Sequence, residues 1–183
     1  KDYPYFVYHF TDVKGYIRFN WDKSNVKSRA NKLILNHYSS KSSARGHLHH
    51  ITELLGLCAG LTGLHEADSS CFYYQTGACS GACQSVEVAT SYNERASEAL
   101  DLLKKSFDYN FFIITDGRNR DEKGIVLIED GHYRGFGYMS TEEMGYGFEE
   151  WKESVKYLPS NPECNQIILT WLEKHPATKI VKI

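Results

Sequence analysis

The chain has 183 residues, a formal net charge of −2 and 42% hydrophobic residues. This composition is typical of a folded globular protein and excludes a disordered one. The nearly balanced charge excludes a global positive field, so contact with nucleic acid would need a local basic patch. No apolar run is long enough to cross a bilayer, and no signal peptide is evident. We therefore expect a cytoplasmic protein without a membrane partner. Because residue 1 is lysine, we also expect a piece of a longer protein.

Hydrophobic periodicity and turn residues predict the secondary structure in chain order. The predicted strands are a hairpin over 5–22, a strand over 32–40, a strand over 109–118, a hairpin over 122–139 and a strand over 178–183. The predicted helices cover 42–57, 90–107, 147–158 and 162–175. The first helix has an apolar stripe of Leu48, Ile51, Leu54 and Leu55 and ends at Gly56. The second hairpin turns at Asp130-Gly131, a strong hairpin signal.

The order of these elements, βββα, a cysteine-rich loop, α, βββ, αα, β, predicts an α+β fold with antiparallel sheets. We predict an N-terminal βββα half at 1–57, a Cys-rich metal or cluster loop at 58–83, and a C-terminal half at 84–183. A single continuous domain is the alternative. No internal repeat or low-complexity linker is visible.

Four of the five cysteines follow the spacing C-x12-C-x7-C-x3-C, at Cys58, Cys71, Cys79 and Cys83. Four thiolates suit a tetrahedral zinc ion or an iron–sulfur cluster. Zinc sites usually take their ligands as two close pairs, and only the last two cysteines form such a pair, so the spacing leans toward a cluster. Reduced core thiols and disulfides are the alternatives, although an odd cysteine count argues against disulfides. His65 is a further candidate ligand.

Other residues of this loop suit a metal site. Gly77 and Gly81 would allow tight turns that point backbone amides at sulfur. The aromatic residues at 72–74 would shield the site from water.

The stretch "CFYYQTGACSGAC", followed by "SYNERASEALDLL", resembles the region after the nuclease domain of UvrC, the incision subunit of excision repair. The resemblance implies a 4Fe-4S cluster on the four cysteines, with zinc as the alternative. UvrC-like loops commonly carry a basic residue and a proline where this chain has Ala78 and Ala82, so the resemblance does not extend to DNA contact through the loop.

The chain also resembles the region downstream of the GIY-YIG endonuclease domain in bacterial proteins that fuse this domain to a DNA polymerase III epsilon-like exonuclease. The stretches "YPYFVYHFTDVKGYI" and "DGRNRDEKGIVLIEDGHYRGFGY" carry this resemblance together with the Cys loop. The chain has no GIY or YIG element and no D-x-E-T start. The family's nuclease chemistry would therefore lie in other domains of the same polypeptide.

Two local basic segments are candidate DNA contacts. One follows the second predicted strand, near Trp21 and Tyr38, and the other lies in the acidic and basic loop "TDGRNRDEKG". Each has an ordinary alternative: a lysine-rich soluble loop for the first, and a hairpin loop with weak surface ion pairs for the second. The candidate nucleic-acid-binding residues are Lys23, Lys27, Arg29, Lys32, Arg118 and Arg120.

No nucleophile–base pair, phosphate-binding glycine loop or isolated carboxylate pair is present, so no catalytic residue is predicted. The sequence predicts a non-catalytic accessory region of a DNA-repair nuclease, organised by a four-cysteine site with a structural or, secondarily, redox role. The alternative is a zinc- or thiol-stabilised protein–protein interaction module. A free-standing Mg²⁺ enzyme using the acidic loop is a weaker third hypothesis.

Overall fold

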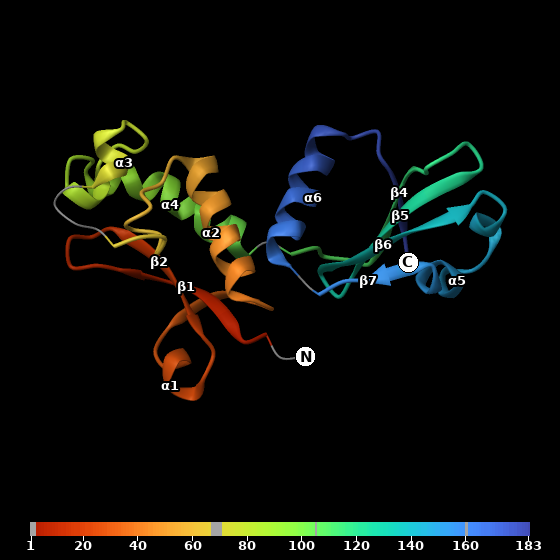
Figure 1. The fold of residues 1–183 in the computed structure, drawn as a ribbon, viewed down its shortest axis with the longest axis horizontal. Helices are drawn as coiled ribbons and strands as arrows, with labels where there is room; N and C mark the ends of the chain where they lie inside the picture. Colours follow the sequence, from red (N-terminus) through yellow and green to blue (C-terminus); the bar gives the residue numbers. More distant parts are fainter. Residues whose placement is uncertain (1–2, 67–70, 105, 160) are drawn as a thin grey trace. The chain divides into compact units, whose positions relative to one another are not determined.

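The computed structural model describes residues 3–66, 71–104, 106–159 and 161–183. It consists of antiparallel sheets and helices, which confirms the α+β prediction. The chain forms two compact units, Lys1–Lys105 and Ser106–Ile183 (Figure 1). The predicted divisions at 57/58 and 83/84 do not coincide with this boundary, because the helix after the Cys loop packs onto the N-terminal sheet. No helix among the described residues is long and apolar enough to cross a membrane.

The first unit is a three-stranded sheet, order β2-β1-β3, with helices α2 and α4 packed on one face. Its elements are β1 (Tyr5–Thr11), β2 (Ile17–Lys23), α1 (Val26–Arg29), β3 (Leu33–Tyr38), α2 (Lys41–Leu55), α3 (Phe72–Gln75), the 3₁₀ turn η1 (Ala82–Gln84) and α4 (Ala89–Lys104). The predicted hairpin, third strand and two long helices are all present. The short α1 and α3 lie in segments where no element was predicted.

Local sequence explains the boundaries of α2. The Ser40 hydroxyl accepts a hydrogen bond from the Ser43 amide, which caps the first turn, and Gly56 ends the helix in the left-handed conformation with φ 61°. The buried side chains of α2 are Ala44, His47, Leu48, Ile51 and Thr52. Leu54, which was predicted to be on the apolar stripe, is 53% exposed.

The second unit is a five-stranded antiparallel sheet, order β7-β6-β5-β4-β8. Its elements are β4 (Phe111–Asp116), β5 (Glu122–Glu129), β6 (His132–Ser140), the 3₁₀ turn η2 (Glu143–Gly145), α5 (Phe148–Glu153), β7 (Val155–Tyr157), α6 (Pro162–Lys174) and β8 (Lys179–Lys182). Asp130 and Gly131 both have positive φ, 54° and 81°, as expected for a two-residue hairpin turn.

The helix predicted over 147–158 was wrong in its second half. The helix α5 ends at Glu153, and the next residues form β7, which pairs with Gly135–Gly137 of β6. Val155 is buried in this strand. A β-branched residue that can add to a sheet edge overrides the weak helical pattern of such a short segment.

The sheet of the second unit has a core on each face. One face packs Phe112, Leu127 and Met139 against Trp151 of α5. Because side chains alternate along a strand, the other face carries a different set, and there α6 covers Phe111 and Ile128. These two cores fix the orientation of every side chain on β6.

Candidate metal centre: a group of four thiols

The four predicted cysteines lie on separate short segments of the first unit. Cys58 follows the end of α2, Cys71 stands immediately before α3, Cys79 lies between α3 and η1, and Cys83 is in η1. Residues 67–70 of the predicted loop lie outside the described residues. All five cysteines of the chain are free thiols, so none forms a disulfide.

The four thiols interact with one another. Cys58, Cys71 and Cys83 each influence the pKa of Cys79, and Cys58 and Cys71 each influence that of Cys83, so the four thiols lie near one another. Cys58 belongs to the core of the unit, and Cys79 and Cys83 pack against it. The structure therefore brings together the four cysteines that the spacing singled out.

Burial and the neighbouring thiols favour the protonated form of Cys79 and Cys83. Burial is the main cause that raises the pKa of Cys79, and the nearby Cys71 and Cys83 add to it, whereas the Gly81 amide lowers it by hydrogen bonding to the sulfur. Burial first, and then contact with Cys58, raises the pKa of Cys83 to about 12, although Gln84 donates a hydrogen bond to its Sγ at 3.7 Å. Thiols bind metal as thiolates, so metal binding here would release protons.

The donor set fits a soft metal ion or a cluster, because it consists of four thiols beside a hydrophobic core. In the described ranges, however, no group of three or more His, Cys, Asp or Glu side chains is arranged to hold a single metal ion. A cluster with several iron atoms separates its ligands more widely than one ion does. The identity of a metal at these thiols stays a prediction.

The predicted extra ligand, His65, lies beside the thiols. Its Nε2 is 3.7 Å from the Sγ of Cys71, and its ring stacks on Tyr73 with the centroids 5.0 Å apart. The two predicted glycines have positive φ, 74° at Gly77 and 80° at Gly81. A Cβ at Gly81 would lie 2.8 Å from the ring of Tyr74, so this turn requires glycine.

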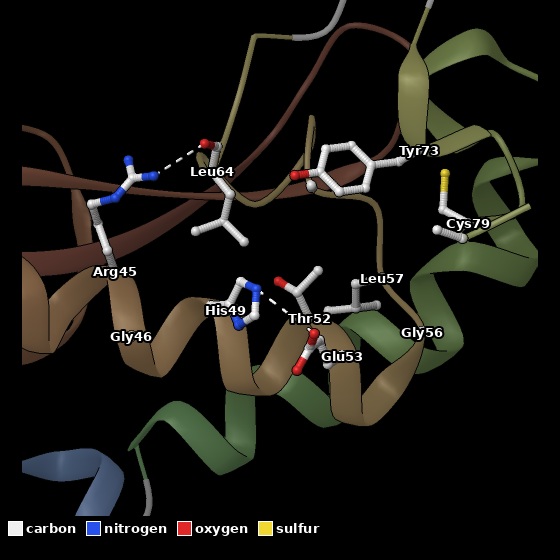
Figure 2. Close-up of a pocket in the computed structure, with 12 residues that line it drawn as sticks. Arg45, Gly46, His49, Thr52, Glu53, Gly56, Leu57, Leu64, Tyr73 and Cys79 are labelled. Carbon is white, nitrogen blue, oxygen red and sulfur yellow. Dashed lines mark hydrogen bonds and ion pairs between the residues drawn. The ribbon is translucent and has the colours of Figure 1, made fainter. Parts of the chain in front are cut away.

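A cleft of about 530 Å³ opens between α2 and the Cys loop, with Cys79 at one end (Figure 2). Arg45 stands at the other end, where its guanidinium donates to the Leu64 carbonyl at 3.2 Å. His49 and Glu53 of α2 face the same cleft and are 3.7 Å apart. The thiol group therefore has a route to solvent on the Cys79 side, while Cys58 and Cys71 are buried.

Two residues of α4 hold Cys58 and the end of α2 in position. Neither of them was identified from the sequence. The backbone amide of Cys58 donates to the hydroxyl of Tyr92, which is fully buried. Arg95 donates to the carbonyl oxygens of Leu55 and Gly56 at the end of α2, at 3.0 and 3.3 Å. Each pairing joins residues at least 34 positions apart, and no local signal in the sequence marks it.

A comparison with protein-family models found that residues 6–102 match the UvrC/Cho excinuclease middle domain. The match covers just over half of the chain, from β1 to α4, and includes all four cysteines. The chain belongs to this family. The predicted resemblance to UvrC is thus confirmed, and the excinuclease middle domain corresponds to nearly the whole first unit. No curated protein and no solved structure matched the chain.

The predicted basic patch, Lys23, Lys27, Arg29 and Lys32, lies at and after the end of β2, in a different part of the first unit from the Cys loop. Lys23, Lys27 and Arg29 are exposed, at and after the end of β2 and in α1, which lies at the end of the sheet away from the Cys loop (Figure 1). Lys32 is instead paired with Asp22 at 3.0 Å. Its ammonium group also lies 4.4 Å above the ring centroid of Tyr8.

The aromatic neighbours predicted for this basic patch behave differently. Tyr38 is fully buried and its hydroxyl is 2.7 Å from Nδ1 of His47, so it cannot contact a phosphate backbone. Trp21 is half-buried, with Lys41 and Arg45 of α2 stacked against its ring.

In the second unit, the loop 117–121 is exposed and bordered by ion pairs. Arg118 donates to both carboxylate oxygens of Glu122, at 2.8 and 2.6 Å, and Lys123 pairs with Asp116 at 3.2 Å. These pairs confirm the prediction of a hairpin loop with surface ion pairs. Arg120 is exposed, and it makes no ion pair within the ranges that the structure describes.

Proposed function

We propose that the chain is a non-catalytic accessory region of a DNA-repair nuclease, in which Cys58, Cys71, Cys79 and Cys83 hold a metal centre that organises the fold. A 4Fe-4S cluster is the proposed cofactor, with zinc as the alternative. The proposed setting is the reducing bacterial cytoplasm, downstream of a GIY-YIG domain and an exonuclease domain in the same polypeptide. The chemistry of strand cleavage belongs to those domains.

The observation that supports this proposal is the proximity of the four thiols within the segment that matches the excinuclease middle domain. Core cysteines do not need one another, because a lone thiol packs as a small hydrophobe. Four thiols that converge from separate segments instead form a ligand set, and metal binding would contribute directly to the folding free energy of the Cys loop.

Metal and acid-labile sulfide analysis, with a visible spectrum, on protein purified without oxygen tests the metal centre. We expect iron and sulfide together, lost in Cys79→Ser. The matched control is Cys164→Ser, because this fifth cysteine lies on α6 in the second unit and should leave the iron content unchanged.

Other results of this measurement decide between the alternatives. One zinc ion per chain without sulfide would contradict the cluster and favour an interaction module. No metal, or equal loss in both variants, would contradict a centre on these thiols and leave the family relationship as the only support.

DNA contact by the basic patch is the second part of the proposal. Lys27 and Arg29 are exposed, and in the described part of the chain neither has an ion-pair partner that phosphate would have to displace. Each phosphate contact adds about 0.9 to the salt slope of the affinity for duplex DNA. The double variant Lys27→Glu, Arg29→Glu should therefore lower this slope by about 2, and the double glutamine variant should weaken binding less at any one salt concentration. Salt-independent binding would contradict phosphate contact.

A further inference from the structure

The strand β6 carries two aromatic side chains that belong to neither hydrophobic core of its sheet. Phe136 is 41% exposed and Tyr138 is 40% exposed, although both lie in a strand with neighbours on each side. Gly135 and Gly137, which alternate with them, are buried. The pattern is the reverse of an ordinary strand, because the large apolar side chains point to solvent and the smallest residues point inward.

Packing accounts for the glycines. A Cβ at Gly135 would lie 2.1 Å from the Lys156 carbonyl oxygen, and one at Gly137 would lie 2.0 Å from that of Ser154. The segment around β7 therefore approaches β6 too closely for any side chain. This close approach gives no reason for aromatic residues on the opposite face.

The register shows what surrounds the two rings. Phe136 pairs with Val126 and Tyr138 pairs with Gly124, so both lie on the face that α6 covers further along. Gly124 offers no side chain next to Tyr138. The two ring planes are nearly perpendicular, at 88°, with their centroids 6.2 Å apart. Because the two rings are not parallel, neither ring stacks on the face of the other.

Cations flank the rings on both sides. The Arg118 guanidinium lies 4.4 Å from the Tyr138 centroid and is held there by Glu122. Lys156 of β7 is exposed and lies directly opposite Phe136. The carboxylate next to this surface is already paired, so the groups left to meet a ligand are aromatic rings and positive charges.

We propose that this surface, defined by Arg118, Phe136, Tyr138 and Lys156, binds single-stranded nucleic acid by stacking bases on the two rings. Aromatic side chains beside positive charges are the means by which proteins bind unpaired strands without reading their sequence. Residues 134–138, Arg-Gly-Phe-Gly-Tyr, also follow the start of the RNP1 pattern, in which two sheet-face aromatics two residues apart stack on bases. Only the strand is alike, because this sheet has five strands in a different order.

The proposal goes beyond the function proposed above, because it places the ligand on the second unit and rests on none of the cysteines. It also assigns Arg118 to the stacking surface rather than to phosphate contact alone. The second unit has thirteen acidic and nine basic residues, so we expect stacking rather than net charge to supply most of the affinity. Binding should therefore depend less on salt than binding at the patch of Lys27 and Arg29.

Fluorescence anisotropy of the full chain with a short labelled oligothymidylate tests the proposal. Phe136→Ala and Tyr138→Ala should each raise the Kd about 5- to 150-fold, the range measured for single stacking residues. Phe136→Tyr and Tyr138→Phe keep a ring and should bind like the wild type. Tyr157→Ala is the matched control, because Tyr157 is 48% exposed in the same sheet but pairs with Gly135 and so faces the other way.

Each other outcome of this experiment has a defined meaning. Equal binding to duplex DNA, or an equal loss in Tyr157→Ala, would overturn the proposal. So would self-association of the wild type that both alanine variants abolish, since a second copy would then cover the rings. Photocrosslinking of a halogenated oligonucleotide to Tyr138 would support it without any variant. Tighter binding of the ribo- than of the deoxyribo-oligonucleotide would keep the surface and assign RNA as its ligand.

Discussion

Replacement of Arg95 by methionine should loosen the first unit at the point where Cys58 is held. The Arg95 guanidinium donates to the Leu55 and Gly56 carbonyls and forms an ion pair with Glu87 at 2.7 Å. Methionine keeps the aliphatic stem against the helix but removes every one of these interactions. The end of α2 would then lose its polar contacts with Arg95 of α4, while the hydrogen bond from the Cys58 amide to Tyr92 remains.

The loss of stability expected in Arg95→Met depends on how deeply the ion pair between Arg95 and Glu87 is buried. The Glu87 side chain is 9% exposed and that of Arg95 is 32% exposed. Removal of one partner of a fully buried ion pair costs about 3–5 kcal/mol, because the other charge stays buried and unpaired. The partial exposure of Arg95 reduces this, so we expect Arg95→Met to lower the free energy of unfolding by about 2 kcal/mol. Adding Glu87→Gln should restore about half of this loss, since no uncompensated charge then remains.

Urea unfolding followed by hydrogen exchange and mass spectrometry measures the free energy of unfolding of the first unit separately from that of the second. Peptides of α2 and α4 should lose protection in Arg95→Met and regain part of it in the double variant. Arg29→Met is the matched control, because Arg29 is exposed on α1, and its replacement should change stability by less than about 0.5 kcal/mol. A loss in Arg95→Met no larger than in the control, or one that is independent of Glu87, would refute the reasoning.

Two further predictions concern the second unit. Gly137→Ala should lower its stability by about 1–3 kcal/mol, because the new methyl group meets the Ser154 carbonyl, whereas Gly145→Ala, where a Cβ meets nothing within 4 Å, should be close to neutral; thermal unfolding of both variants checks this. Hydrogen bonds from Arg118 lower the pKa of Glu122 to about 2, so the contribution of this carboxylate to stability is complete above pH 4.5 and is lost as the pH falls toward 2. An NMR titration of Glu122 should show this pKa return toward 4.5 in Arg118→Gln, and an unchanged pKa would show that the pair is not formed in solution.

Most of the fold was predictable because its elements carry local signals. The hairpin turn at Asp130-Gly131 and the end of the first long helix at Gly56 each depend on a few neighbouring residues, and the structure confirms both. The strand β7 was missed because its three residues pair with residues 135–137, which lie 18 to 22 positions earlier, and only that contact decides between helix and strand. The boundary near residue 105 was missed for the same reason, since the packing of α4 is tertiary.

The grouping of the four cysteines was predictable from the sequence, but the residues that support them were not. Clustered cysteines in a chain that has few of them are a compositional signal, so the four thiols were found by spacing. Tyr92 and Arg95 lie within an ordinary amphipathic helix, and nothing in the sequence links them to Cys58 or to the end of α2. The exposed rings of β6 carry no signal in the sequence: aromatic residues in strands usually belong to a core, and only the register and the burial show that Phe136 and Tyr138 do not.

The arrangement of the first unit separates the thiols from the basic patch, and the β1–β2 hairpin is one structural link between them. The β1–β2 hairpin contacts the Cys loop and the residue segment after it. The amide of Phe19 in β2 donates to the Leu61 carbonyl at 2.8 Å, and Lys14 in the hairpin turn donates to Ser85 at 3.3 Å. The other end of the same hairpin leads into α1 with Lys27 and Arg29 (Figure 1). A metal centre that only stabilises the Cys loop should therefore leave DNA affinity unchanged when the metal is removed with a chelator. If the affinity falls instead, the hairpin must transmit the loss along its own strands, and hydrogen exchange in β1 and β2 would rise together with the loss of metal.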